Sequence, residues 1–243
     1  TKNIINTIQT LEFEQVSFSY DGKDKAINNI SFFIKSGEKI AIVGKNGSGK
    51  STIFKLACGL YDNYEGNIYI NGINLRSIQK ETYYKRISAL FQDYLKYELT
   101  LRENIGLGEL SKLHDDEALI NALRYTEVDS VFFQGQGKFN SINLEQQLGN
   151  WFEEGRQLSG GQWQKIALSR AYLKDADCYF LDEPSSALDP VSETKIFKTF
   201  FDLSQDKIGL FITHKPSITQ FVDQILYLED GCVVEKGSFA DLN

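Results

Sequence analysis

Residues 44–51, GKNGSGKS, constrain the fold of this chain more than any other segment, because they match the pattern G-x-x-x-x-G-K-[ST]. The apolar run IAIV enters this segment, and the helix-prone run STIFKLACGL leaves it. A glycine-rich turn from a buried strand into a helix points backbone N–H groups and the positive helix end at one place. The alternative is such a turn without a ligand, but every fixed position of the pattern is filled. The segment therefore predicts a phosphate-binding loop in an α/β fold.

The residue types in this loop predict what each would do with a bound phosphate. We expect Lys50 to reach the β- and γ-phosphates and Ser51 to ligate Mg²⁺. The glycines let the backbone turn its N–H groups inward. The predicted phosphate-binding residues are Gly44, Asn46, Gly47, Ser48, Gly49, Lys50, Ser51 and Thr52.

The rest of the chain reads as strands, then helices, then both in alternation. The first 90 residues contain the β-prone runs LEFEQVSFSY and AINNISFFI and the hairpin signal Asn71-Gly72. From residue 93 to 173 helical patches such as DDEALINALRYTEV replace the strand signals. Residues 174–243 alternate strands with helices and end in a hairpin at Asp230-Gly231. This order predicts an α/β fold with a mainly parallel sheet, an N-terminal antiparallel β subdomain and an inserted helical subdomain.

Composition and charge exclude several classes of protein. A charged share of 24% and an apolar share of 42% are globular values, which argue against disorder or a disulfide-stapled miniprotein. A net charge of −7 argues against a nucleic-acid partner. The three scattered cysteines fit a reducing compartment, and we expect Cys58 and Cys178 to fill the core. No run of about 18 apolar residues occurs, so no membrane span is predicted.

A second segment that predicts a chemical role ends in two acidic residues, Asp182 and Glu183. Residues 178–181, CYFL, read as a buried strand that delivers Asp182 to the carboxyl edge of the sheet, where α/β folds bind ligands. We expect Asp182 to hold Mg²⁺ through water, and Glu183 to orient or deprotonate an attacking water molecule. Alone, this pair could equally cap a strand, but a phosphate-binding loop upstream favours the catalytic interpretation.

Residues 158–162, LSGGQ, are the most distinctive string in the chain. Ser159 and Gln162 have the spacing of a capping box, S-x-x-Q, ahead of the helical run WQKIALSRAYL. A capped helix alone does not explain Gly160 and Gly161, because adjacent glycines weaken a first helical turn. We expect such glycines where the backbone must approach a phosphate closely.

Together these motifs make the chain resemble the nucleotide-binding domain of an ATP-binding cassette (ABC) transporter. LSGGQ is the signature of that family, and Asp182 follows Gln162 by 20 positions, as in the family. The resemblance covers about residues 11–242 and implies ATP and Mg²⁺ as ligands. It implies a linker at residues 1–10, a P-loop NTPase core with β subdomain at residues 11–92 and 174–243, and a helical signature subdomain at residues 93–173.

The resemblance also implies roles for residues outside these motifs. Tyr20 resembles the aromatic residue that stacks on adenine, although alone it could equally be a core aromatic. Gln92, in LFQD, resembles the glutamine that contacts Mg²⁺ and the attacking water. His214 resembles the histidine that touches the γ-phosphate, whereas His114 is expected at the surface. Residues 186–189, SALD, resemble the loop that crosses the dimer interface. The implied catalytic residues are Lys50, Gln92, Glu183 and His214, and the implied metal ligands are Ser51, Gln92 and Asp182.

In this family two domains pair head to tail, and each ATP lies between the phosphate loop of one copy and LSGGQ of the other. The resemblance therefore implies that Ser159, Gly160, Gly161 and Gln162 serve ATP held by a second copy. ATP binding closes the pair, and hydrolysis removes contacts that exist only in the closed dimer. Because both halves of the site are intact, we expect a homodimer with two competent sites.

The opening residues resemble exporters in which this domain follows a membrane domain. A transmembrane partner, fused or separate, is thus implied at the cytoplasmic face of a bacterial plasma membrane, docked on the surface that residues 83–105 bracket. Residues 149–155 depart from the multidrug exporter string TEVGxxG. Residues 151–171, WFEEGRQLSGGQWQKIALSRA, are closer to exporters of lantibiotics and related peptides. We expect export of such a peptide, with a multidrug or lipid exporter as the alternative.

Two alternative functions lie outside transport: a non-transport ATPase and a regulatory module that only binds nucleotide. A non-transport ABC ATPase that acts on ribosomes or DNA is expected to carry two cassettes or a long coiled coil. This chain has one cassette, no heptad run and an acidic net charge. A regulatory module that binds nucleotide without turnover would not need Glu183 and His214. A Mg²⁺-dependent ATPase assay separates these interpretations.

Overall fold

The computed structural model describes residues 2–134 and 141–241, so the outer ends of the predicted linker and domain, residues 1 and 242–243, lie outside it. The chain folds into two compact units, which are described separately below. Within the described residues, no helix combines the length and the apolar character that crossing a membrane requires. Unit 1 is Thr1–Ala89, Ala176–Glu183 and Ser204–Asn243, and unit 2 is Leu90–Asp175 and Pro184–Leu203.

The N-terminal part of unit 1 is an antiparallel sheet of four strands in the order β2-β1-β4-β5. Phe13 and Phe32 stack across β1 and β2 with ring centroids 4.5 Å apart. Asn71 and Gly72 join β4 to β5 with φ of 52° and 75°, which is the geometry of a type I′ hairpin turn, so this predicted turn is confirmed. The strands are β1 (Thr10–Phe18), β2 (Ile27–Lys35), β4 (Glu65–Ile70) and β5 (Ile73–Asn74).

The second sheet of unit 1 has six strands in the order β12-β11-β3-β10-β9-β6. The strands β11, β3, β10 and β9 run parallel, and β12 returns antiparallel through the predicted turn at Asp230-Gly231. Every residue of β9 and β10 is buried, as expected for a parallel sheet covered on both faces. The strands are β3 (Lys39–Gly44), β6 (Ile87–Leu90), β9 (Cys178–Asp182), β10 (Ile208–Ile212), β11 (Gln224–Glu229) and β12 (Cys232–Gly237).

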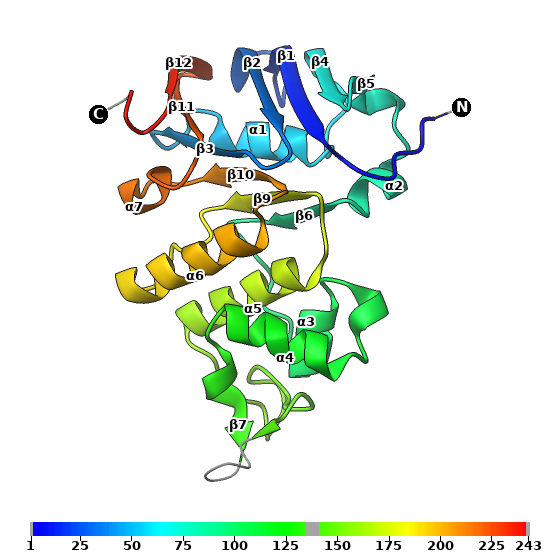
Figure 1. Ribbon diagram of the computed structural model, residues 1–243, viewed down its shortest axis with the longest axis vertical. Helices are drawn as coiled ribbons and strands as arrows, with labels where there is room; N and C mark the ends of the chain where they lie inside the picture. Colours follow the sequence, from blue (N-terminus) through cyan, green and yellow to red (C-terminus); the bar gives the residue numbers. More distant parts are fainter. Residues whose placement is uncertain (1, 135–140, 242–243) are drawn as a thin grey trace. The chain divides into compact units, whose positions relative to one another are not determined.

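Helix α1 (Lys50–Ala57) lies between the two sheets of unit 1 (Figure 1). Phe54 of α1 meets Phe180 of β9 edge-on, with ring centroids 6.4 Å apart. Cys58 and Cys178 are buried free cysteines in this region, as the sequence predicts. Unit 1 also contains a 3₁₀ helix at Leu75–Ser77 and the short helices α2 (Lys80–Tyr84) and α7 (Pro216–Thr219).

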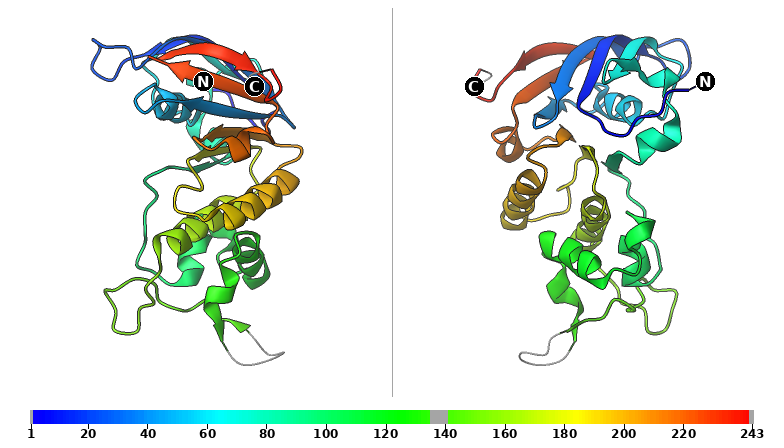
Figure 2. Two further views of the ribbon diagram at one scale, coloured as in Figure 1. Left: turned by 90° about the vertical axis from the view of Figure 1, so that its left-hand side faces the viewer. Right: turned by 45° about the vertical axis from the view of Figure 1, so that its right-hand side comes forward.

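Unit 2 is mainly helical, and helix α5 packs beside α3 and α4 around one apolar cluster (Figure 1 and Figure 2). Trp163, the N-terminal tryptophan of α5, is 6% exposed and belongs to this cluster with Leu101 of α3 and Leu119 of α4. The helices are α3 (Leu101–Gly106), α4 (Asp116–Tyr125), α5 (Gly160–Leu173) and α6 (Pro190–Leu203), with 3₁₀ turns at Leu110–Lys112 and Asp129–Phe132 and the short strands β7 (Phe133–Gln134) and β8 (Ser141–Ile142).

The residues that precede β1, which the sequence predicts as a linker, lie along unit 1. Ile5 and Ile8 are 6% and 2% exposed. The backbone N–H of Ile8 donates to Asp177 Oδ2 at 2.9 Å, just before β9. The carbonyl of Asn3 accepts from the N–H of Gln79 at 2.8 Å, just before α2. These contacts fasten the segment to two parts of unit 1 that are far apart in the sequence.

Candidate functional site

The phosphate loop connects β3 to α1 in unit 1, as the motif predicts. Gly44, Gly47 and Gly49 have φ of 147°, 82° and 101°, a region that favours glycine. A Cβ on Gly44 would lie 2.2 Å from the carbonyl oxygen of Leu228, and a Cβ on Gly49 would lie 2.6 Å from that of Ala26. Within the described chain, no side chain caps α1 at Gly49. Packing therefore fixes the loop, and the first turn of α1 is left for an anion.

Lys50 holds its positive charge over this loop. Its Nζ donates hydrogen bonds of 2.8 Å to the carbonyl oxygens of Gly44 and Lys45, and the residue is 6% exposed. Burial lowers the pKa of Lys50, and the negative charges of Glu183 and Asp182 oppose that shift. The ammonium group is thus placed where phosphate oxygens would replace the two carbonyl oxygens as stronger, charged partners.

Five buried side-chain oxygens of unit 1 lack a hydrogen-bond partner within the described residues, and two of them, Ser48 Oγ and Asp182 Oδ1, belong to predicted site residues. The other three belong to Tyr64, Ser204 and Gln224. Each unmet group costs about 1–3 kcal/mol. Asp182 ends β9, where burial raises its pKa and a hydrogen bond with Ser51 acts against that shift. A buried carboxylate beside a hydroxyl is the oxygen donor set that Mg²⁺ prefers. The chemistry of these residues therefore fits the predicted metal ion and phosphate.

Glu183 and His214 follow two neighbouring parallel strands and meet at the same edge of the sheet. His214 Nε2 lies 2.9 Å from Glu183 Oε1. The N–H of Glu183 donates to the carbonyl of Ile212 at 3.0 Å. Glu183 has φ of +46°, which is strained for a residue with a side chain and costs on the order of 1 kcal/mol. The fold thus holds this carboxylate in an unfavourable backbone conformation beside an imidazole, which is common at functional sites.

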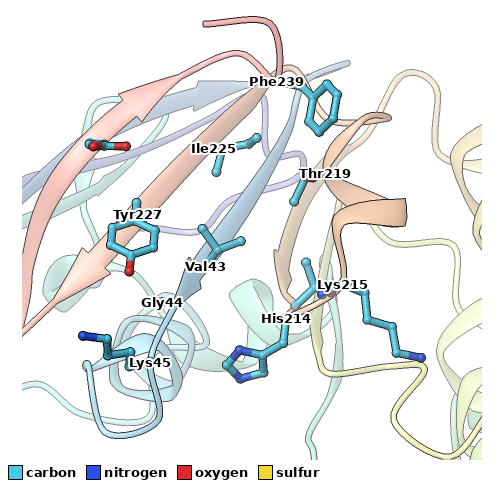
Figure 3. Close-up of a pocket in the computed structure, with 11 residues that line it drawn as sticks. Val43, Gly44, Lys45, His214, Lys215, Thr219, Ile225, Tyr227 and Phe239 are labelled. Carbon is cyan, nitrogen blue, oxygen red and sulfur yellow. The ribbon is translucent and has the colours of Figure 1, made fainter. Parts of the chain in front are cut away.

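His214 also lines a pocket of about 570 Å³ in unit 1 (Figure 3). The walls of the pocket include Val43 and Gly44 at the end of β3, and Tyr227 of β11. In Figure 3 the imidazole of His214 lies on the side of the pocket where the phosphate loop carries Lys45. The carboxyl edge of the parallel strands, where the loop begins, is therefore hollowed and open to a ligand.

Tyr20 is 53% exposed, so it is not the core aromatic that the sequence left open. Its hydroxyl and that of Thr52 in α1 lie 3.1 Å apart. Phe18 and Tyr61 meet its ring edge-on, with centroids at 4.9 Å and 5.7 Å, and Lys55 Nζ lies 5.8 Å from its centroid. Tyr61 was missed from the sequence because it lies beyond α1 with no pattern to mark it. The cluster offers an aromatic surface held beside the phosphate loop.

In unit 2 the signature segment forms the capping box that its spacing predicts. Ser159 Oγ accepts from the N–H of Gln162 at 3.3 Å, and Gln162 Oε1 accepts from the N–H of Ser159 at 2.9 Å. Gly160 is open, with nothing within 4 Å of an added Cβ. An added Cβ on Gly161 would lie 2.8 Å from the carbonyl oxygen of Ala187. Packing therefore gives a second reason for glycine at position 161, and the phosphate role of both glycines stays a prediction.

Gln164 joins the signature helix α5 to the SALD loop, and sequence analysis missed it. Its Nε2 donates to Ser186 Oγ at 3.1 Å, and its Oε1 accepts from the N–H of Ala187 at 2.8 Å. The residue is 1% exposed. A polar residue in the middle of a helix carries no sequence signal for this role, because only the fold brings the loop to it. The signature segment and the SALD loop are thus packed together inside unit 2.

The remaining predicted residue, Gln92, is exposed and follows the last residue of β6, Leu90, by two positions. It belongs to unit 2, whereas Lys50, Asp182 and Glu183 belong to unit 1. His114 is exposed, as predicted. The structure therefore gathers the phosphate loop, the two acids, His214 and Tyr20 in unit 1, and gathers Gln92, the signature segment and the SALD loop in unit 2.

Comparisons with known proteins identify the family of the chain. A model of the family described as "ABC transporter" matches residues 27–186. The chain is similar to the subtilin transport ATP-binding protein SpaT of Bacillus subtilis, with 47% identity over 99% of this chain and 39% of that protein. It is similar to the nisin transport ATP-binding protein NisT of Lactococcus lactis subsp. lactis, with 46% identity over 95% of this chain and 38% of that protein.

More distant likenesses were found as well. The beta-(1-->2)glucan export ATP-binding/permease protein NdvA of Bartonella henselae is 33% identical over 98% of this chain and 38% of that protein. The solved structure of a bacterial Atm1-family ABC exporter with ATP bound matches with a TM-score of 0.88 and 27% identity, over 100% of this chain and 41% of that chain. The chain thus spans about two fifths of the length of each of these proteins.

Proposed function

Because the chain belongs to the ABC transporter family, an ATP-binding family with characteristic ATPase activity, we propose that it powers a bacterial exporter of a lantibiotic-like peptide. The identities of 47% and 46% to subtilin and nisin transport proteins, against 33% to a glucan exporter, support the peptide. A multidrug or lipid exporter is the alternative, and neither SpaT nor NisT is named as one. A nucleic-acid substrate is disfavoured by the net charge of −7.

ATP binding is assigned to the phosphate loop and its surroundings in unit 1. The N–H groups of the loop and of the first turn of α1 bind the phosphates, and Lys50 contributes the positive charge. Tyr20 stacks on the adenine, with Tyr61 and Lys55 supporting its ring. Ser51 and Asp182 would hold Mg²⁺, which neutralises charge on the β- and γ-phosphates.

Hydrolysis is assigned to the Glu183–His214 pair, and the 2.9 Å contact between them is the observation that carries the proposal. Glu183 orients a water molecule and accepts its proton as the water oxygen bonds to the γ-phosphorus. The bond between that phosphorus and the bridging oxygen breaks, and ADP leaves with the electron pair. His214 fixes the carboxylate and donates toward the γ-phosphate. Neither residue would be needed by a module that only binds nucleotide.

A second copy of the chain would complete each site. Ser159 and the open backbone at Gly160 contribute donors to the γ-phosphate held by the other copy. Gln92 would join Ser51 and Asp182 in holding Mg²⁺. Capping fixes the Ser159 side chain before any partner arrives, so little ordering entropy is lost on association. Two copies with intact motifs give two competent sites.

The transmembrane partner would dock on unit 2 at the cytoplasmic face of the membrane. Leu95 and Leu99, between Gln92 and α3, are 63% and 36% exposed. Trp151 and Phe152 are 86% and 53% exposed, and the N–H of Trp151 donates to Glu98 at 2.8 Å. The hydrogen bond places the two exposed apolar segments side by side, which marks a protein-binding surface.

Replacing Glu183 with glutamine tests the assignment of hydrolysis. We expect the release of phosphate from Mg²⁺·ATP to fall at least about a hundredfold, because an amide cannot take the proton. ATP binding should stay within about twofold of wild type, measured by displacement of a fluorescent nucleotide. Glu65→Gln, which removes an exposed carboxylate of unit 1 paired with Lys25, is the control and should keep full activity. Near-wild-type hydrolysis by Glu183→Gln would remove Glu183 as the base.

The substrate needs a separate experiment on the full transporter in membranes. A lantibiotic precursor should stimulate its ATPase rate and accumulate outside cells, and Glu183→Gln should abolish both effects. Stimulation by a lipid or a multidrug substrate, with none by the peptide, would reject the peptide and retain the ATPase.

A further inference from the structure

The segment after Gln92 is bonded to the start of the signature helix α5. Tyr94 lies two residues beyond Gln92, and its hydroxyl donates to the carbonyl oxygen of Gly160 at 3.2 Å. Its ring packs against the apolar cluster of unit 2, and burial raises the pKa of its hydroxyl. The bond therefore joins the loop that carries Gln92 to the backbone of the LSGGQ motif itself.

The same segment is bonded to the last turn of α5 through Arg170. Its Nη1 donates to the carbonyl oxygen of Leu95 at 2.7 Å, and its guanidinium lies 4.9 Å from the centre of the Tyr97 ring. Its Nε and Nη2 donate to the backbone and side-chain oxygens of Asn104 at 2.8 Å and 2.7 Å. Asn104 is fully buried and donates back to the carbonyl oxygens of Tyr97, Leu99 and Thr100.

Arg170 makes these contacts at an electrostatic cost. Burial lowers its pKa to about 10, with Tyr97 and Tyr94 opposing the shift. No carboxylate of the described residues forms an ion pair with it, so neutral oxygens and an aromatic ring are its only compensation. A half-buried guanidinium without an acid is a poor way to stabilise a fold, because its charge is desolvated without a counter-charge. Its rigid fork of donors is well suited to fixing the position of a backbone.

We propose that Tyr94 and Arg170 are positioning residues that clamp the segment after Gln92 onto both ends of α5, so that Gln92 and Ser159 move as one body. Gln92 would sense the ATP of its own copy, whereas Ser159 serves the ATP of the partner copy. The clamp would then make each chain present its signature segment only when its own Gln92 is in place. This inference rests on the proposed function, because it assigns regulation to that same site.

Steady-state ATPase measurements on the chain test the clamp with Tyr94→Phe and Arg170→Lys. Tyr94→Phe removes one neutral hydrogen bond and should lower kcat about two- to tenfold. Arg170→Lys loses the forked contact with Asn104 and should lower kcat by a similar or larger factor. KM for ATP should stay within about twofold in both, because Tyr20, Lys50 and the phosphate loop are in unit 1. Unchanged kcat in both variants would overturn the proposal.

Matched variants separate positioning from loss of folding. Tyr125→Phe removes the hydroxyl of an exposed tyrosine of α4, and Arg102→Met removes an arginine that pairs with Asp116 and Glu145. Both should keep kcat, even though Arg102→Met is expected to lower the melting temperature. If kcat follows the melting temperature across all four variants, Tyr94 and Arg170 are merely structural.

A double-mutant cycle with Gln92→Ala gives a readout that a structural lesion would not move. If Tyr94 acts through Gln92, adding Tyr94→Phe to Gln92→Ala should change kcat less than about 1.5-fold. Independent, multiplicative losses would overturn the proposal. If the wild-type chain hydrolyses no ATP, the proposed function fails instead, and amide hydrogen exchange still tests the clamp. Tyr94→Phe should then speed exchange in residues 95–100 relative to Tyr125→Phe.

Discussion

The two units of this chain prepare for ATP in opposite ways. In unit 1, Ser48 Oγ and Asp182 Oδ1 are buried without a partner, and Glu183 is held in a strained backbone conformation. In unit 2, Ser159 and Gln162 satisfy each other in a capping box, and Gly160 is simply open. The unpaired oxygens and the strained backbone of unit 1 cost free energy, an energetic deficit that a ligand relieves. The signature segment of unit 2 is a finished surface in the sense that its hydrogen bonds are already made before a second copy presents a phosphate.

This difference suits the order of events in the proposed cycle. A site with unmet oxygens and a fixed lysine gains most from a ligand that supplies charge, so in the proposed cycle ATP would bind to unit 1 first. A capped, satisfied segment binds weakly to anything except a phosphate presented at the right place. Substitutions in each unit test whether unit 1 gains free energy from a ligand and whether the signature segment of unit 2 is already satisfied without one.

The largest effect should come from removing the positive charge of unit 1. Lys50→Met deletes a charged donor to the phosphates, each such bond being worth about 1.5–3 kcal/mol, so ATP affinity should fall about ten- to hundredfold or more. Fluorescent-nucleotide binding measures this. Lys35→Met removes an exposed lysine of unit 1 and should leave the affinity unchanged. An affinity for Lys50→Met within about twofold of wild type would show that the loop backbone alone binds the phosphates.

The two signature glycines should respond in opposite directions to the same substitution. Gly161→Ala forces a Cβ to within 2.8 Å of the carbonyl oxygen of Ala187, and overpacking of this kind costs about 1–3 kcal/mol. Gly160→Ala meets no atom, and the better helix propensity of alanine should stabilise the fold by up to about 1 kcal/mol. Thermal unfolding measures both. A Gly160→Ala variant that is more stable yet hydrolyses ATP more slowly would show that Gly160 serves function alone, and equal destabilisation by both would contradict the distinction.

Local motifs explain why much of unit 1 could be predicted from sequence. The phosphate loop, which connects β3 to α1, and the two hairpin turns are each encoded by a few adjacent residues. Asp182 and His214 each follow an apolar run, and parallel strands bring their carboxyl ends to one edge, so their common location also follows from sequence. The 2.9 Å contact of Glu183 with His214 does not, because it depends on β9 and β10 being neighbours.

What sequence analysis missed depends on contacts between distant segments. Gln164 is polar, yet it is buried because the SALD loop returns to α5 and bonds its amide. Tyr61 supports Tyr20 across a turn that no periodicity marks. Ile5 and Ile8 lie in a segment with polar neighbours, yet both are buried, and the distant residue Asp177 accepts a hydrogen bond from the N–H of Ile8. In each case the side chain alone carries no information about its partner.

The smallest effect, and the most direct test of the contrast, is the pH dependence of two aspartates. Burial raises the folded-state pKa of Asp182 in unit 1, so its charge destabilises the fold above that pKa, and the penalty disappears as pH falls through it. Hydrogen bonds from Ser192 lower the folded-state pKa of Asp189 in unit 2, so its charge stabilises the fold above the unfolded pKa, and this gain is lost as pH falls through the folded pKa. Without nucleotide, Asp182→Asn should therefore raise stability at neutral pH, whereas Asp189→Asn should lower it slightly.

The difference for Asp182→Asn should shrink as the solution is acidified from about pH 8 to about pH 4, whereas the difference for Asp189→Asn should persist to about pH 4 and shrink only below it, which urea unfolding at each pH measures. The two stability differences have opposite signs because Asp182 is buried with an unpaired oxygen in unit 1, whereas Asp189 is exposed and accepts hydrogen bonds in unit 2. Saturating Mg²⁺·ATP should reverse the sign for Asp182→Asn, because wild type gains a metal ligand that the variant lacks, and should leave Asp189→Asn unchanged. If Asp182→Asn destabilises the nucleotide-free chain at neutral pH, the carboxylate is already satisfied there, and the energetic deficit assigned to unit 1 does not exist.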